Sequence, residues 1–194
     1  MMIIISAVIA SLGLLNNSAA VVIGAMLVAP LLWPVLGIAM GMLVGDWTMI
    51  RLSSISIVMS CIIAIVTAML ITFQYIPLGT SNEILQQTNI GFMLPVAVAA
   101  GVAAAFSISY ETIREAIPGI AISVALIPPL VTIGIGLGGT DWNLMTSALE
   151  LFLINLLGII GTSFIVFYLL GFRSYSRTVE IEVKKEEKAL KDKR

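Results

Sequence analysis

Long apolar stretches, separated by short polar segments, run along this chain. A helix needs roughly 20 apolar residues to cross the roughly 30 Å hydrocarbon core of a bilayer. We therefore expect six membrane-spanning helices, at residues 2–16, 19–45, 52–76, 92–109, 116–139 and 145–171. The first is short and the second is long, so residues 16–18 are expected to form a tight turn. The pattern predicts an all-α membrane protein.

The composition supports this fold class. Hydrophobic residues make up 59% of the 194 residues and charged residues 11%, whereas a soluble domain averages about 25% charged residues. The chain has no histidine, and Cys61 is its single cysteine. Histidine-ligated metals, histidine-based catalysis and an intrachain disulfide are therefore excluded. Because no nucleophile–base pair or metal cluster is apparent, we expect no enzyme activity, cofactor, metal or nucleic-acid partner.

The basic residues predict the orientation of the chain, since Lys and Arg collect on the cytoplasmic side of membrane proteins. With six spans and both termini inside, Arg51, Arg114 and the eight basic residues of the tail all lie in the cytoplasm. Five or seven spans would split this set. We expect a multi-pass cell-membrane protein with a transmembrane domain at residues 1–172 and a charged cytoplasmic tail at 173–194.

The two halves of the chain resemble each other when the sequence is shifted by 95 residues. The shift aligns Gly24 with Gly119, Pro34 with Pro129, Gly41 with Gly136, and Asp46-Trp47 with Asp141-Trp142. Each half has three spans, an odd number, so the second copy enters the membrane from the opposite side. The sequence thus predicts a 3+3 inverted-topology repeat, with halves at about residues 1–76 and 92–171. We interpret the two aspartates as helix caps beside interfacial tryptophans.

Prolines are expected to break the second and fifth spans, at Pro30 and Pro34 and at Pro128 and Pro129. Each proline inside a helix removes a backbone hydrogen bond, at about 3 kcal/mol. Broken backbone is tolerated at membrane depth where it is buried in protein or lines a cavity. In transporters built from inverted repeats, paired broken helices form the substrate site near the bilayer midplane. The alternative is a kink whose freed carbonyls are satisfied by neighbouring helices.

Other polar and small residues complete the set of candidates. Gly41, Gly136, Ser60 and Asn155 are predicted to line the same substrate-binding site. Ser60 and Asn155 are equivalent under the shift, and the alternative role for Asn155 is an interhelical hydrogen bond. Close helix packing at the Gly37-x-x-x-Gly41 motif indicates tight bundling or a homo-oligomer.

A charged cluster is expected at the cytoplasmic end of the fourth span. It consists of Glu111, Arg114 and Glu115. Arg114 lies three residues after Glu111, so the two side chains can pair on one helix face. The pair is interpreted either as a local contact at the membrane surface or as a gate.

Two stretches of the chain resemble a known family. The first, Ser11 to Asp46, reads SLGLLNNSAAVVIGAMLVAPLLWPVLGIAMGMLVGD and resembles the core motif of domain-of-unknown-function family 389. The second, Pro118 to Leu137, reads PGIAISVALIPPLVTIGIGL and is similar to that family's second motif. The resemblance covers most of the chain up to about Gly171. It implies a polytopic membrane protein of the transporter kind and names no substrate.

The sequence therefore favours an integral membrane transporter or channel-like protein that binds a small solute or ion near the bilayer midplane. An anion held by helix N-termini, a neutral solute, and a cation held by freed carbonyls all fit. The alternative is a non-transporting structural or assembly subunit of a membrane complex. A wide polar cavity between the second and fifth spans would favour transport, and a dry interior there would favour the structural role.

Overall fold

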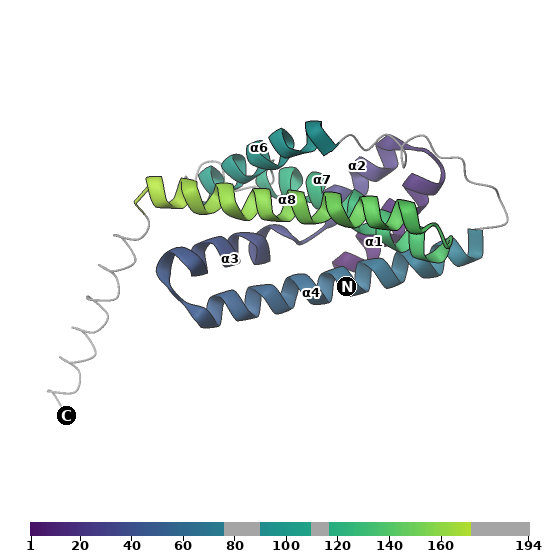
Figure 1. Ribbon diagram of the computed structural model, residues 1–194, viewed down its shortest axis with the longest axis horizontal. Coiled ribbons are helices and arrows are strands. Elements are labelled where there is room, and N and C mark those ends of the chain that lie inside the picture. Colours follow the sequence, from purple (N-terminus) through teal and green to yellow (C-terminus); the bar gives the residue numbers. More distant parts are fainter. Residues whose placement is uncertain (76–89, 110–116, 172–194) are drawn as a thin grey trace, which may run out of the picture.

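The computed structural model describes residues 1–75, 90–109 and 117–171 (Figure 1). These residues form seven α-helices and contain no strand. The helices are α1 (Met2–Leu15), α2 (Ala19–Val28), α3 (Leu32–Val44), α4 (Trp47–Tyr75), α6 (Ile90–Ser109), α7 (Ile117–Gly138) and α8 (Trp142–Leu169). The all-α prediction is confirmed, and residues 16–18 connect α1 to α2 as a short turn.

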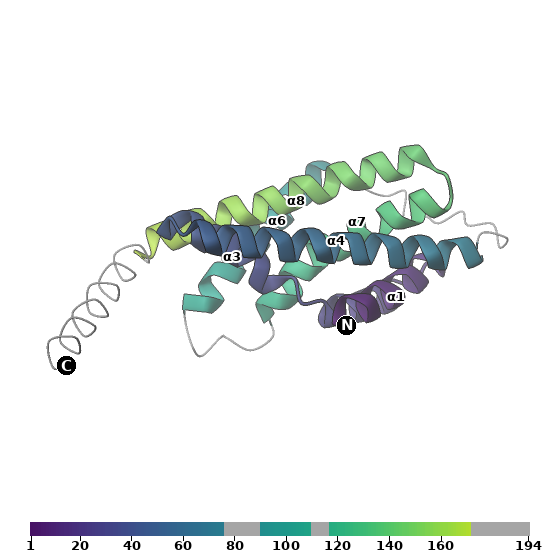
Figure 2. The same cartoon turned by 90° about the horizontal axis from the view of Figure 1, so that it is seen from below.

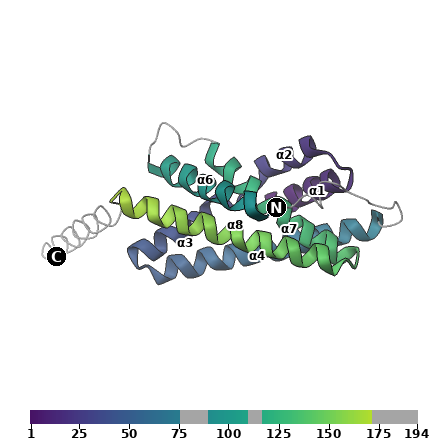
Figure 3. The same ribbon diagram turned by 45° about the horizontal axis from the view of Figure 1, so that its top comes forward.

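Helix α7 lies at the centre of the molecule. Between Ala125 and Gly136 every residue except Pro128 is buried. A helix that is apolar on all sides is stable only when neighbours surround it. Helices α1, α2, α4, α6 and α8 all pack against α7. In Figure 3, α6 lies along one side of α8, and α3 and α4 lie along the other side.

Helices α4 and α8 carry large apolar surfaces on the outside of the molecule. With 29 and 28 residues, both are long and apolar enough to cross a membrane, and α2 and α3 together form a third candidate. Phe73 on α4 and Leu157 on α8 are 72% and 67% exposed. Exposed apolar surface of this extent marks contact with lipid or protein. The length and outer surface of these helices indicate a membrane protein.

The turns that join α3 to α4 and α7 to α8 repeat each other in detail. The Gly41 carbonyl accepts from the Asp46 N–H at 3.0 Å, and the Gly136 carbonyl accepts from the Asp141 N–H at 2.9 Å. Each aspartate Oδ1 then accepts from a backbone N–H three residues later, at 3.1 Å and 3.0 Å. The glycine carbonyl, the aspartate N–H, the aspartate Oδ1 and the N–H three residues later in the first turn each have a counterpart 95 residues further along the chain. Both aspartates are thereby confirmed as helix caps.

The two turns lie at opposite ends of the long axis of the molecule (Figures 1 and 2). Helix α4 leads away from one turn and α8 leads away from the other, so these two long helices run antiparallel. This arrangement is compatible with two halves of opposite orientation.

The prolines behave differently in the two halves. Helices α2 and α3 meet at a bend of 56°, with Pro30 in the short connection between them. Pro34 lies in the first turn of α3, where a missing N–H is tolerated because it would have no helical partner. Pro128 and Pro129 lie inside a continuous α7. The expected break of the fifth span is therefore wrong, and Pro34 does not interrupt a helix.

Candidate functional site

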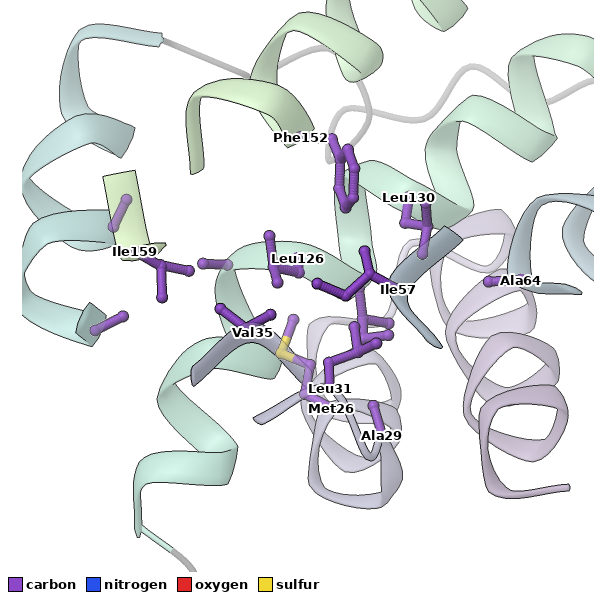
Figure 4. Close-up of a cluster of buried hydrophobic side chains, with 14 of the residues drawn as sticks. Met26, Ala29, Leu31, Val35, Ile57, Ala64, Leu126, Leu130, Phe152 and Ile159 are labelled. Carbon is purple, nitrogen blue, oxygen red and sulfur yellow. The ribbon is translucent and has the colours of Figure 1, made fainter. Parts of the chain in front are cut away.

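The interrupted backbone of the first half packs against the middle of α7. Ala29 and Leu31 are buried beside the break, whereas Pro30 between them is exposed. Figure 4 shows Leu31 gathered with Met26 of α2 in the same buried cluster as Leu126 of α7. Leu31 and Leu126 are equivalent under the 95-residue shift. The break and its counterpart in the second half thus share one core.

A side chain from α8 satisfies one of the carbonyls that the two prolines of α7 leave without a helical donor. Pro129 has no N–H, so the Ala125 carbonyl four residues earlier loses its helical donor. The Asn155 Nδ2 group donates to this carbonyl at 2.8 Å. Both residues are buried, at 4% and 1% exposed. The freed backbone group is satisfied by a neighbouring helix, as the alternative interpretation of the sequence proposed.

A second hydrogen bond lies one turn further along α7. The Thr132 hydroxyl donates to the Pro128 carbonyl at 2.8 Å. Threonine in a helix commonly forms this bond to the carbonyl four residues earlier, and it is associated with helix bending. The proline pair is therefore bracketed by two side-chain hydrogen bonds, one from within α7 and one from α8.

The other end of the Asn155 carboxamide has no hydrogen-bond partner among the described residues. Its Oδ1 atom is fully buried and unpaired. The orientation of the amide follows from chemistry, because the Ala125 carbonyl can only accept and so must face the Nδ2 group. Leaving a buried acceptor unpaired costs about 1–3 kcal/mol. This oxygen is the candidate contact for a ligand or an internal water.

The remaining predicted site residues are distributed over the molecule. Pro128 and Pro129 lie on α7 near Asn155, and Pro30 and Pro34 flank the start of α3. Ser60 is half-buried on α4. Gly41 and Gly136 lie near the ends of α3 and α7, where their carbonyls bond the turns to the next helix. The two turns are at opposite ends of the molecule (Figures 1 and 2), so the structure does not gather these glycines in one site with the prolines.

Two further sets of predicted residues lie outside the described residues. They are the cluster Glu111, Arg114 and Glu115 and the charged tail at 173–194.

Both glycines of the turns are required for packing. A Cβ added at Gly41 would lie 2.8 Å from Ile50 Cγ1, and a Cβ at Gly136 would lie 2.8 Å from the Met145 backbone nitrogen. Gly37 packs closely against Ser53 of α4 in the same way. The Gly37-x-x-x-Gly41 motif is therefore used inside the chain, between α3 and α4.

Helix α7 approaches α4 through a second pair of glycines. A Cβ at Gly134 would lie 2.5 Å from the Ile65 carbonyl oxygen, and one at Gly138 would lie 2.9 Å from the Met69 carbonyl oxygen. Such spacing of small residues lets two helix backbones come close. The interface between α7 and α4 is thus closely packed.

A pocket of about 280 Å³ lies at one end of the molecule, away from the break. It is lined by Met42, Leu43, Val44, Gly45, Phe164 and Tyr168, from the ends of α3 and α8. Around Leu31 and Leu126 the described residues form a tightly packed apolar cluster. Within the described ranges no three His, Cys, Asp or Glu residues come together as a metal site.

These features define a helical membrane protein with one buried, incompletely bonded polar group at its centre. The chain belongs to the family described as Domain of unknown function (DUF389), which matches over residues 26–161. It is also similar to the uncharacterised protein MJ0678 of Methanocaldococcus jannaschii, with 29% identity over 177 residues. That alignment covers 90% of this chain and 55% of the relative, so the chain spans about half the length of the relative. No solved structure matches the chain.

Proposed function

We propose that this protein is a multi-pass transporter or channel-like protein of the cell membrane. In this proposal a small solute or ion binds near the bilayer midplane, between the α2–α3 break and the middle of α7. The observation that carries the proposal is a difference between equivalent segments. Residues 29–31 form a break with a 56° bend, whereas residues 124–126 remain helical.

The inverted repeat is part of this proposal. The matched turns at opposite ends, and the antiparallel course of α4 and α8, support it. The distribution of Lys and Arg supports six spans with both termini in the cytoplasm. Repeats of this type move substrate by rocking or gating one repeat against the other around a fixed site.

The difference between the halves suggests how the gating works. In the described state the first half is bent and the second half is straight, with Asn155 holding the Ala125 carbonyl. In the opposite state Asn155 releases this carbonyl, α7 bends at Pro128 and Pro129, and the first half straightens. Leu31 and Leu126, which are both buried in the described state, then become accessible to water, each from a different side of the membrane.

Thiol labelling tests this mechanism. In a Cys61→Ala background, Leu31→Cys and Leu126→Cys are made separately and treated with a membrane-impermeant thiol reagent in oriented vesicles. We expect the two cysteines to react slowly and from opposite sides. The matched control is Ala64→Cys on α4, which is also fully buried but lies away from the break and should stay unlabelled.

A structural or assembly subunit is the second candidate. The observation that favours it is the closely packed apolar cluster around Leu31 and Leu126 (Figure 4). If neither cysteine reacts from either side, and liposomes containing the protein pass no solute in a flux screen, the transport proposal is wrong. The structural role then stands.

A further inference from the structure

The pocket of about 280 Å³ lies where α3 and α8 end side by side, at one end of the molecule (Figures 1 and 2). Its α3 side consists of Met42, Leu43, Val44 and Gly45. None of these residues has an oxygen or nitrogen atom in its side chain. Any polar atom on this side of the pocket therefore belongs to the main chain.

The main-chain carbonyls of residues 42–44 have no hydrogen-bond donor among the described residues. The last carbonyls of a helix have no partner within the helix. At the end of α3 the N–H groups of Gly45 and Asp46 both donate to the Gly41 carbonyl, at 2.9 Å and 3.0 Å, so the three carbonyls that follow Gly41 receive neither of them. They lie at the negative end of the α3 dipole. This side of the pocket therefore attracts positive charge.

The α8 side of the pocket is aromatic. Phe164 and Tyr168 lie four residues apart, so their rings share one face of α8. Aromatic rings attract cations over their faces, and ammonium groups are recognised in this way. The Tyr168 hydroxyl adds one more acceptor oxygen. Arg51 is the single basic residue of the described ranges, and it does not line the pocket.

The neighbouring residues place the pocket at the membrane surface. Trp47, which follows the α3–α4 turn, is exposed, and tryptophan is enriched where a helix meets the headgroup region. Ile165 and Leu169 follow the two aromatic residues of the pocket in the chain and are exposed apolar side chains of α8. The pocket is thus bordered by a surface that contacts lipid tails, and a lipid headgroup can reach it without leaving the bilayer.

We infer that this pocket binds the primary ammonium group of a lipid headgroup, as in phosphatidylethanolamine. A primary ammonium has three N–H donors and no acceptor, and three free carbonyls lie at the end of α3. The pocket is several times larger than the roughly 30 Å³ that a water molecule occupies in the liquid, so it admits the ammonium with its adjoining methylene groups. An anionic headgroup would need several donors, and the Tyr168 hydroxyl is the one side-chain donor of the lining. The site is separate from the α2–α3 break, so the inference does not depend on transport.

Thermal unfolding in mixed micelles of detergent and lipid tests the ligand. Phosphatidylethanolamine, phosphatidylcholine and phosphatidylglycerol with the same acyl chains are compared, and ethanolamine without lipid is the fourth condition. We expect phosphatidylethanolamine to raise the melting temperature saturably, by about 3–6 °C at ten times its dissociation constant. Phosphatidylcholine has the positive charge but no N–H donor, so it should bind more weakly. Phosphatidylglycerol, and ethanolamine at the same concentration, should cause no shift.

Variants locate the binding at the pocket. Tyr168→Leu removes an exposed ring and should weaken phosphatidylethanolamine binding tenfold or more. The matched control is Tyr75→Leu, which removes an exposed tyrosine at the opposite end of the molecule and should keep the shift (Figures 1 and 2). Met42→Lys supplies an ammonium group from the chain itself and should abolish the shift, whereas Met42→Leu should keep it. Where Tyr168→Leu fails to fold, the two Met42 variants decide.

Four outcomes would overturn the inference. They are the absence of a shift with phosphatidylethanolamine, an equal shift with either of the other two lipids, an equal shift with ethanolamine in solution, and an undiminished shift in Tyr168→Leu or Met42→Lys. An equal shift with ethanolamine would assign the pocket to a soluble amine. None of these outcomes affects the labelling of Leu31→Cys and Leu126→Cys, so failure of the lipid site and failure of the proposed transport function are distinguishable.

Discussion

The side-chain amide of Asn155 donates a 2.8 Å hydrogen bond to the Ala125 carbonyl, the group that Pro129 leaves without a helical donor. The two residues are 30 positions apart in the chain and belong to different helices. This bond accounts for the main difference between the halves of the molecule. At the equivalent place in the first half the helix is bent by 56° around Pro30.

A double-mutant cycle measures this bond. Asn155→Leu leaves the Ala125 carbonyl unpaired and should lower the free energy of unfolding by about 1–3 kcal/mol. Pro129→Ala supplies a new N–H to the same carbonyl, so it should have a smaller effect alone than in the Asn155→Leu background. We expect a coupling energy of about 1–2 kcal/mol, measured by denaturant unfolding. Additive effects of the two substitutions would mean that they do not share a carbonyl.

The prolines of the first half should differ in importance. Pro34→Ala lies in the first turn of α3 and should change stability by less than about 0.5 kcal/mol, because no helical hydrogen bond is gained. Pro30→Ala removes the restraint at the break and should favour a straighter α2–α3 segment. The rate at which Leu31→Cys is labelled reports this. It should rise in the Pro30→Ala protein, because Leu31 becomes accessible in the state with a straight first half, and it should stay unchanged with Pro34→Ala. An equal effect of both substitutions would contradict the assignment.

Close packing of α7 on α4 should make Gly134 intolerant of substitution. A Cβ at this position would lie 2.6 Å from Ala68 Cβ, so Gly134→Ala forces the two helices apart and should cost about 1–3 kcal/mol. Gly161→Ala on α8 is the matched control, since nothing lies within 4 Å of its added Cβ. It should be neutral or slightly stabilising, because alanine favours helix. The melting temperatures of the two variants provide the comparison.

The inverted topology predicts that equivalent surface positions lie on opposite sides of the membrane. Thr48 and Asn143 are both exposed, follow the two capping aspartates and correspond under the 95-residue shift. In a Cys61→Ala background, Thr48→Cys should react with an impermeant reagent from the cytoplasmic side and Asn143→Cys from the outside. Labelling of both from the same side would refute the inverted repeat.

The sequence by itself determined the helices and their turns. Apolar stretches in a bilayer must satisfy their backbone groups internally, and for an uninterrupted stretch of about 20 residues this requires a helix. The six expected segments agree with the described helices to within a few residues at most boundaries. The aspartates at 46 and 141 were recognisable as caps because an aspartate before a helix accepts hydrogen bonds from its first turn. These are local interactions, and a local pattern is sufficient to read them.

Only the tertiary structure decided which proline breaks a helix. Pro30 and Pro129 carry the same local penalty of about 3 kcal/mol. Helix α7 stays continuous because Asn155 reaches the freed carbonyl from another helix and because neighbours enclose α7 along its middle. The packing roles of Gly41 and Gly136 depended likewise on Ile50 and Met145 across each turn. The helix that supplies a donor to a freed carbonyl, and the residue that packs against a glycine, both depend on which helices pair. The periodicity of apolar residues in the sequence does not encode this pairing.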